Sequence, residues 1–112
     1  MNRTKSVRGG CHCGATRFAV THQPEDSFVC QCSLCRKQGT LWVCYAPEAF
    51  QLQKPSDDVG IYRAEDKAAH HFCRGCGCVT WSVMTDAQVW VNARLFDEAE
   101  GLTIPRHDMV YA

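Results

Sequence analysis

The spacing of nine cysteines is the feature that most constrains this 112-residue chain. Eight of them lie in three short clusters: C-x-C at Cys11 and Cys13, C-x-C-x-x-C at Cys30, Cys32 and Cys35, and C-x-x-C at Cys73 and Cys76 with Cys78 two positions further on. The ninth, Cys44, stands alone. Thiols at such short spacings can form disulfides, act as a redox pair or bind a metal ion as thiolates.

The charge balance and the N-terminal residues predict the cellular location of the chain and which partners it lacks. Lysine plus arginine equals aspartate plus glutamate at twelve each, a balance that suggests neither a nucleic-acid partner nor an anionic membrane surface. The first ten residues, "MNRTKSVRGG", are basic but lack the apolar stretch of a secretory signal. No apolar run approaches the roughly 20 residues that span a bilayer. We therefore expect a soluble, cytoplasmic protein with no nucleic-acid or membrane partner.

A cytoplasmic location favours metal binding over the other two uses of the cysteines. Thiols are kept reduced in that compartment, and an odd number of cysteines cannot all be paired. A thioredoxin-like redox pair would need a βαβ pattern around its C-x-x-C, and none surrounds the motifs of this chain. Closely spaced thiolates are typical ligands of zinc.

The hydrophobic pattern predicts an all-β domain. In "QVWVNARLF", Val89 and Val91 lie on one side and Trp90 and Asn92 on the other, which is the period of a strand. The stretches that we expect to form strands are 16–20, 40–46, 59–64, 77–84 and 88–96. Helical turns are expected only around "PEAF" and after "CSLC", and "RGG" at 8–10 is typical of a turn. The prediction is a single domain of about seven short strands, in a closed or tented sheet or in two small packed sheets.

The cysteine clusters predict two zinc sites of different kinds. Cys11 and Cys13 together with Cys73 and Cys76 supply the four ligands of a closed structural site, which would staple a domain whose core is small. The middle cluster supplies three ligands and leaves an open position, as catalytic zinc sites do.

Two cysteines leave alternatives to this arrangement. Cys44 or Cys78 could join the middle cluster and close a second structural site, and Cys78 could replace Cys76 in a C-x4-C geometry. For Cys44 we favour a third role, that of a small buried apolar residue.

Four segments of the chain carry a resemblance to a known family. "GGCHCGATRF", "CQCSLCRKQG", "YRAEDKAAHHFCRGCG" and "VNARLFD" resemble the glutathione-dependent formaldehyde-activating enzyme (GFA) family, also called the centromere protein V/GFA domain, over about residues 8–97. The resemblance implies a single zinc-stapled β-tent of short antiparallel sheets, a fold shared with a Rab-binding zinc protein family. It also implies two zinc ions per chain, with Cys11, Cys13, Cys73 and Cys76 as structural ligands and Cys30, Cys32 and Cys35 as ligands of the catalytic zinc.

The activity implied by the resemblance is a carbon–sulfur lyase reaction. Members of the family are credited with condensing glutathione with formaldehyde to S-(hydroxymethyl)glutathione, so the implied partners are a small thiol and an aldehyde. Arg36 and Lys37, directly after the middle cluster, are candidate substrate-binding residues because a cation there favours a thiolate or receives a glutathione carboxylate. The alternative is a non-catalytic interaction module in which both zinc sites are structural.

Overall fold

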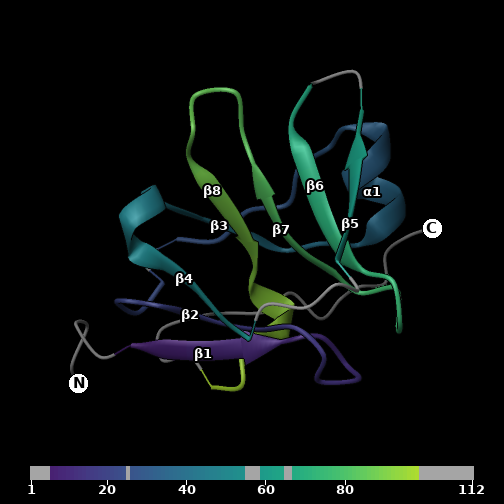
Figure 1. The fold of residues 1–112 in the computed structure, drawn as a ribbon. Helices are drawn as coiled ribbons and strands as arrows, with labels where there is room; N and C mark the ends of the chain where they lie inside the picture. The colour runs from purple at the N-terminus through teal and green to yellow at the C-terminus, as the bar shows by residue number, and fades with distance from the viewer. Residues whose placement is uncertain (1–5, 25, 55–58, 65–66, 99–112) are drawn as a thin grey trace.

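Two antiparallel sheets and little helix make up the computed structural model, which describes residues 6–24, 26–54, 59–64 and 67–98 (Figure 1). The strands are β1 Val7–Gly10, β2 Arg17–Val20, β3 Trp42–Tyr45, β4 Phe50–Lys54, β5 Val59–Arg63, β6 Ala69–Cys73, β7 Val79–Val83 and β8 Val89–Asn92. The helical segments are α1 Ser33–Gln38 and the short 3-10 helices η1 Pro47–Ala49 and η2 Ala93–Leu95. The predicted all-β class of short antiparallel sheets is confirmed.

The two sheets differ in size and in how far their strands lie apart along the chain. The smaller sheet has the order β1-β2-β4, and the larger one has the order β3-β8-β7-β6-β5. In the larger sheet β5 to β8 follow one another as a meander, whereas β3 joins through β8. The smaller sheet lies at the lower left of Figure 1, across the end of the larger one.

The hydrophobic core contains residues from both sheets. Phe18 and Val20 of β2 are buried, as are Val89 and Val91 of β8, and all four belong to one apolar cluster with residues of β1, β3 and β7. Trp90 points to the opposite face of the larger sheet, where it packs edge-on against Phe28. Trp90 is thus less buried than its neighbours Val89 and Val91, as the period-two pattern of β8 predicts, whereas in β2 Ala19 is buried as well as Phe18 and Val20.

Two local expectations were wrong. The strand expected over 88–96 ends at Asn92, whose side-chain oxygen accepts a hydrogen bond from the Arg94 N–H and so caps η2. The turn expected at 8–10 is part of β1. Its glycines allow a close approach of backbones, because a Cβ on Gly9 would lie 2.5 Å from the Leu95 carbonyl oxygen.

The helix α1 begins inside the middle cysteine cluster and not after it. The Cys32 sulfur accepts a hydrogen bond from the Cys35 N–H and thereby caps the helix N-terminus. The helix ends at Gln38, and its C-cap Gly39 has a φ of 72°, the left-handed conformation that glycine favours. No helix in the described part of the chain is long and apolar enough to cross a membrane.

Candidate metal centres

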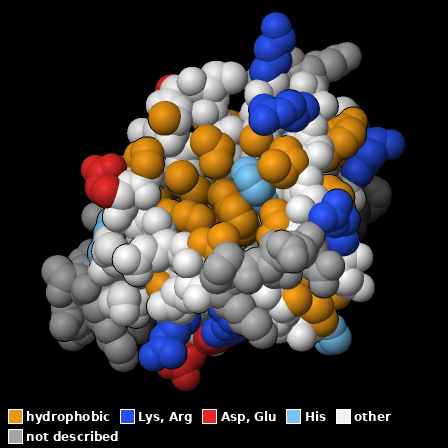
Figure 2. All heavy atoms as spheres, in the orientation of Figure 1, with side chains coloured by type: hydrophobic (Ala, Val, Ile, Leu, Met, Phe, Trp, Pro, Cys, Tyr) orange, Lys and Arg blue, Asp and Glu red, His pale blue; other side chains and the backbone are white. Residues whose placement is uncertain are grey.

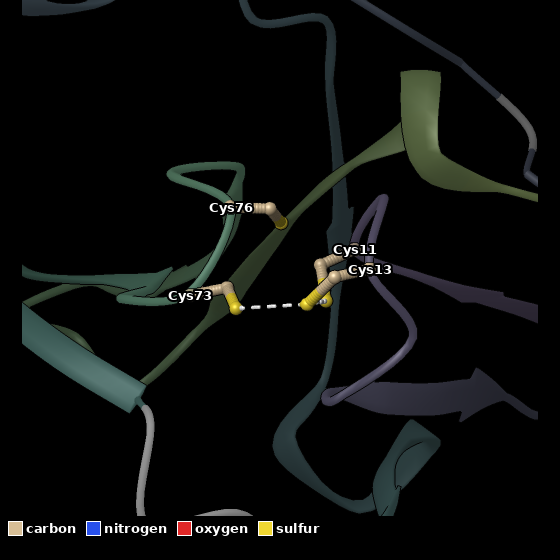
Figure 3. A group of neighbouring side chains, drawn as sticks. All are labelled: Cys11, Cys13, Cys73 and Cys76. Atoms are coloured by element: carbon tan, nitrogen blue, oxygen red, sulfur yellow. Dashed lines mark hydrogen bonds between the residues drawn. The ribbon is translucent and has the colours of Figure 1, made fainter.

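The first cysteine group is assembled from two turns that are far apart in the sequence. Cys11 and Cys13 lie in the turn between β1 and β2, while Cys73 ends β6 and Cys76 lies in the turn that follows. Their side chains point toward one another from the two turns (Figure 3). The four sulfurs all lie within 4.8 Å of one another, with 3.7 Å between those of Cys11 and Cys13 and 3.6 Å between those of Cys13 and Cys73.

These distances fit a tetrahedral metal ion. Sulfurs bound at about 2.3 Å in a tetrahedral zinc site lie about 3.8 Å from one another, close to the 3.6 and 3.7 Å found here. A disulfide would bring two sulfurs to about 2.05 Å, and all nine cysteines are free. The residues present therefore fit a four-thiolate metal site.

Backbone amides support the sulfurs of this group. The Thr16 N–H donates to the Cys11 sulfur and the Gly75 N–H to the Cys73 sulfur, each at 3.3 Å. Backbone N–H groups of Cys78 and Cys13 lower the pKa of the Cys76 thiol to about 5. Hydrogen bonds of this kind orient metal ligands and favour their charged form.

Crowding of four thiols also has an electrostatic cost. A hydrogen bond from the Ala15 backbone favours ionised Cys13, yet the neighbouring Cys73 and Cys11 thiols raise its pKa to about 11. Several thiolates at this spacing repel one another unless a cation lies between them. The donor set of this group thus fits a bound cation better than a set of free thiols.

The second group lies within six residues of the chain, at the start of α1. The sulfurs of Cys30, Cys32 and Cys35 lie within 4.8 Å of one another. Cys35 is buried and accepts a hydrogen bond from the Trp42 indole N–H at 3.3 Å, whereas Cys32 is exposed. Three donors with one of them facing solvent fit a four-coordinate ion with one position open.

The thiols of Cys35 and Cys32 in this second group differ in pKa. Burial raises the pKa of Cys35 to about 12. The Cys35 backbone N–H lowers the pKa of Cys32. Cys35 therefore holds its proton unless a cation displaces it, while Cys32 ionises more readily.

The two remaining cysteines join neither group among the residues that the structure describes. Cys44 is exposed, so our expectation of a buried apolar residue was wrong. It lies on β3 opposite Trp90 and lines a cavity of about 350 Å³ with His22 and Asp26. Cys78 is half-buried, and the geometry gives no support to its use in place of Cys76.

The sequence analysis named two residues beside the second group, Arg36 and Lys37, and missed a third, Trp42. Arg36 and Lys37 are exposed on α1, so both are accessible to a ligand, and their role stays a prediction. The contact of Trp42 with Cys35 was missed. No spacing rule could have found it, because Trp42 follows the cluster as part of a strand that also carries core residues.

The chain is similar to known proteins both in sequence and in fold. A family model described as "Glutathione-dependent formaldehyde-activating enzyme" matches residues 6–111. An "Uncharacterized lyase" of Schizosaccharomyces pombe is 34% identical over 104 residues, which cover 85% of this chain and 72% of that protein. A "Putative glutathione-dependent formaldehyde-activating enzyme" of Halomonas elongata is 33% identical over 85 residues, covering 67% of this chain and 54% of that relative. A crystal structure of a Rhodobacter sphaeroides protein superposes with a TM-score of 0.72 at 26% identity, covering 86% of this chain and 90% of that chain.

Proposed function

The chain belongs to the glutathione-dependent formaldehyde-activating enzyme family, and we propose that it is a zinc-dependent carbon–sulfur lyase-type enzyme. Its reaction would condense the thiol of glutathione with formaldehyde to S-(hydroxymethyl)glutathione. The names of the relatives in Schizosaccharomyces pombe and Halomonas elongata, a lyase and a formaldehyde-activating enzyme, support this reaction class. The chain spans about half the length of the Halomonas relative, so the activity is proposed for this domain on its own residues.

The observation that carries the proposal is the unequal number of donors in the two cysteine groups. We assign Cys11, Cys13, Cys73 and Cys76 to a closed structural zinc site and Cys30, Cys32 and Cys35 to a second, catalytic zinc site, two ions per chain. Zinc at the second site would supply two things: a thiol held as thiolate at neutral pH and polarisation of an aldehyde oxygen.

Side chains around the second group would hold the reacting groups in place. The Trp42 N–H fixes the buried Cys35 sulfur, and the exposed Cys32 marks the side from which substrates enter. Arg36 and Lys37 lie next to this entrance and are placed to receive a carboxylate of glutathione. In the reaction a bond forms between the thiol sulfur and the aldehyde carbon, and the thiol proton ends on the aldehyde oxygen. No oxidant or reductant is needed.

A second candidate function rests on exposed apolar side chains. Ile61 and Tyr62, on the edge strand β5, are 54% and 53% exposed. Figure 2 shows hydrophobic side chains gathered around a histidine on the face that Figure 1 presents. Such a surface is typical of a protein-interaction module, in which both metal sites would be structural.

Titration of the cobalt-substituted protein with glutathione tests the enzymatic proposal against this alternative. Three protein thiolates and an exchangeable position predict that the visible charge-transfer bands of the second site change as glutathione is added. The Cys32→Ser variant is the control, because it should lose these changes while keeping the bands of the first site. Bands that stay constant at millimolar glutathione would reject thiol chemistry at this metal. Formation of S-(hydroxymethyl)glutathione above the uncatalysed rate would then establish the second substrate.

A further inference from the structure

A cavity of about 350 Å³ lies along the outer edge of β3. β3 is the last strand of the larger sheet on this side, because its neighbour in the sheet is β8. The lining comes from β3 and from residues that precede the middle cysteines: Val43, Cys44 and Tyr45 on the strand, and His22, Asp26 and Phe28 across from it. The cavity therefore borders the backbone of an edge strand.

Residues 26–28 begin to pair with this edge and then leave a gap. Phe28 and Trp42 form an isolated antiparallel bridge, in which the Phe28 N–H donates to the Trp42 carbonyl at 3.0 Å and the Trp42 N–H donates to the Phe28 carbonyl at 2.9 Å. A ladder continued by two residues would pair Asp26 with Cys44. No such pair forms among the described residues, and both residues line the cavity. The ladder therefore has a gap at Cys44.

The backbone N–H and C=O of Cys44 are directed toward this gap. Successive residues of a strand direct these two groups to opposite sides. Leu41 faces β8, because its carbonyl accepts from the Ala93 N–H at 2.7 Å, so Trp42 and Cys44 face the other way. The groups of Trp42 are paired with Phe28, whereas those of Cys44 have no partner in the part of the chain that the structure describes. Cys44 is exposed, so a ligand in the cavity can pair with its backbone.

Contacts with the larger sheet fix the residues on both sides of the gap. On one side the Tyr45 hydroxyl donates to the His22 carbonyl at 3.2 Å, and the two rings pack with 5.0 Å between their centroids. On the other side the Phe28 ring packs edge-on against Trp90 with 4.9 Å between centroids. Trp90 is the residue of β8 that lies opposite Cys44. The gap is therefore bordered by residues with defined positions, which favours binding of an extended ligand.

The second cysteine group lies next to the gap. Cys30 follows Phe28 by two positions, and Trp42, which donates to the Cys35 sulfur, precedes Cys44 by two positions. Two residues of extended chain span at most about 7 Å. Side chains two positions apart on a strand lie on the same face, so Cys44 lies on the face of β3 that contacts the second group. A tripeptide held at Cys44 is therefore long enough to reach the second group.

The chemistry of the gap fits a peptide. A peptide residue offers the N–H and C=O that an unpaired strand residue lacks, which is how extended peptides bind to sheet edges. In glutathione the cysteinyl residue lies between two amide bonds, so it offers both groups without a charge. The two outer residues carry carboxylates, which the Asp26 carboxylate in the lining disfavours.

We propose that the backbone of Cys44 binds the cysteinyl residue of a peptidic thiol such as glutathione. The ligand N–H donates to the Cys44 carbonyl and the Cys44 N–H donates to the ligand carbonyl, so the ligand fills the gap in the ladder. Side chains of directly paired residues lie on the same face of a sheet, which directs the ligand thiol to the face of Trp42 and the second cysteine group. The proposal rests on the proposed function, because it names how that same substrate is held.

Two substitutions of Cys44 separate its backbone from its side chain. Both Cys44→Pro and Cys44→Ala remove the thiol, but only Cys44→Pro also removes the N–H, and an edge strand tolerates proline where that N–H has no partner in the sheet. Calorimetric titration of the zinc-loaded proteins should show that Cys44→Pro binds glutathione about tenfold more weakly than Cys44→Ala does. Equal affinities of the two variants would overturn the proposal.

Modified ligands give the same test without a change in the protein, which matters if Cys44→Pro does not fold. Glutathione methylated at the cysteinyl nitrogen lacks the donor to the Cys44 carbonyl and should bind wild type about tenfold more weakly than glutathione. Glutathione methylated at the glycyl nitrogen is the matched control, because it keeps that donor and should bind more tightly than the other methylated ligand. Equal affinities for the two methylated ligands would overturn the proposal.

S-methylglutathione separates this proposal from the proposed function, because its sulfur cannot bind a metal as a thiolate. It should shift the amide resonance of Cys44 and slow the hydrogen exchange of that amide, whereas 2-mercaptoethanol, a thiol without a peptide, should do neither. Protection of the Cys44 amide, with cobalt bands that do not respond to glutathione, would reject the enzymatic proposal and keep the peptide site. Cobalt bands that respond to glutathione, with no protection of the Cys44 amide, would reject the peptide site alone.

Discussion

The two cysteine groups differ in the length of chain that each one closes. The four-cysteine group brings together Cys13 and Cys73, which are 60 residues apart, and so links the smaller sheet to the larger one. The three-cysteine group lies within six residues, at the start of one short helix. A metal that closes a long loop contributes to the stability of the whole fold, whereas a metal held by a local segment contributes little beyond it.

The hydrogen bonds to the sulfurs of the two groups show the same difference. The first group receives its N–H donors from its own turns, through Thr16 and Gly75. The second group contacts the larger sheet through Trp42, whose indole N–H donates to the Cys35 sulfur. The first group therefore joins the two sheets, whereas the second group lies on one short helix beside the larger sheet.

The largest effect that tests this contrast comes from one exposed cysteine in each group. Cys13→Ser should lose the first metal and with it most of the stability of the domain, because structural zinc is worth roughly 10–16 kcal/mol of apparent binding free energy and a domain has only about 5–15 kcal/mol in all. Cys32→Ser should lose the second metal and melt within a few degrees of wild type. Metal analysis and thermal unfolding followed by circular dichroism measure both.

The exposure of Cys13 and Cys32 makes the pair a matched one, since neither substitution removes a buried side chain. We expect two zinc ions in wild type and one in Cys32→Ser. If both variants melt at the same temperature, the division into a structural first site and a second site that contributes little to stability is wrong.

The sequence predicted which cysteines lie together, and the fold class, for a physical reason. Thiols two or three positions apart in a turn reach the same ion almost regardless of the surrounding fold, and the resemblance to the family, now confirmed, rests on those spacings. Period-two alternation similarly identified β2 and β8. Both signals are local.

Features that depend on distant segments could not be predicted in this way. The glycines of β1 favour a turn by composition, but the strand forms because Gly9 lies against η2. The cavity beside Cys44 combines β3 with His22 and residues 26–28, and no local pattern indicates that their pairing ends after the bridge between Phe28 and Trp42. Cys44 was misassigned because a strand pattern alone does not say which face is covered.

An intermediate effect is expected from Trp42→Phe, which removes the hydrogen bond between the larger sheet and the Cys35 sulfur. Burial raises the pKa of Cys35 to about 12 while the Trp42 hydrogen bond lowers it, so removing the donor should raise the pKa further. Protons then compete more strongly with the metal. We expect the second zinc to bind about tenfold more weakly and to be released at a higher pH than in wild type.

Trp90→Phe is the control for this variant. Trp90 lies 5.8 Å from Trp42 between ring centres, and the structure shows no contact of its indole N–H with a cysteine of the described chain. The loss of ring volume is the same in both variants. A second-site affinity that falls equally in Trp42→Phe and Trp90→Phe would mean that packing, and not the hydrogen bond, supports Cys35.

The smallest effect should come from two glycines in the turn of the first group. Gly77 has a φ of 83° and donates to the Cys73 carbonyl at 2.7 Å, so alanine there strains the turn by roughly 1–2 kcal/mol. At Gly75 an added methyl group would meet the Cys13 and Cys73 sulfurs at an ordinary 3.6 Å, without a left-handed backbone. Denaturant unfolding of the zinc-loaded proteins should show a lower denaturation midpoint for Gly77→Ala than for wild type, and a midpoint close to that of wild type for Gly75→Ala. The zinc affinity of the second group should stay the same in both variants. Equal midpoints would show that the backbone of this turn adjusts to a side chain, and the first group would then be less rigid than its role in joining the two sheets requires.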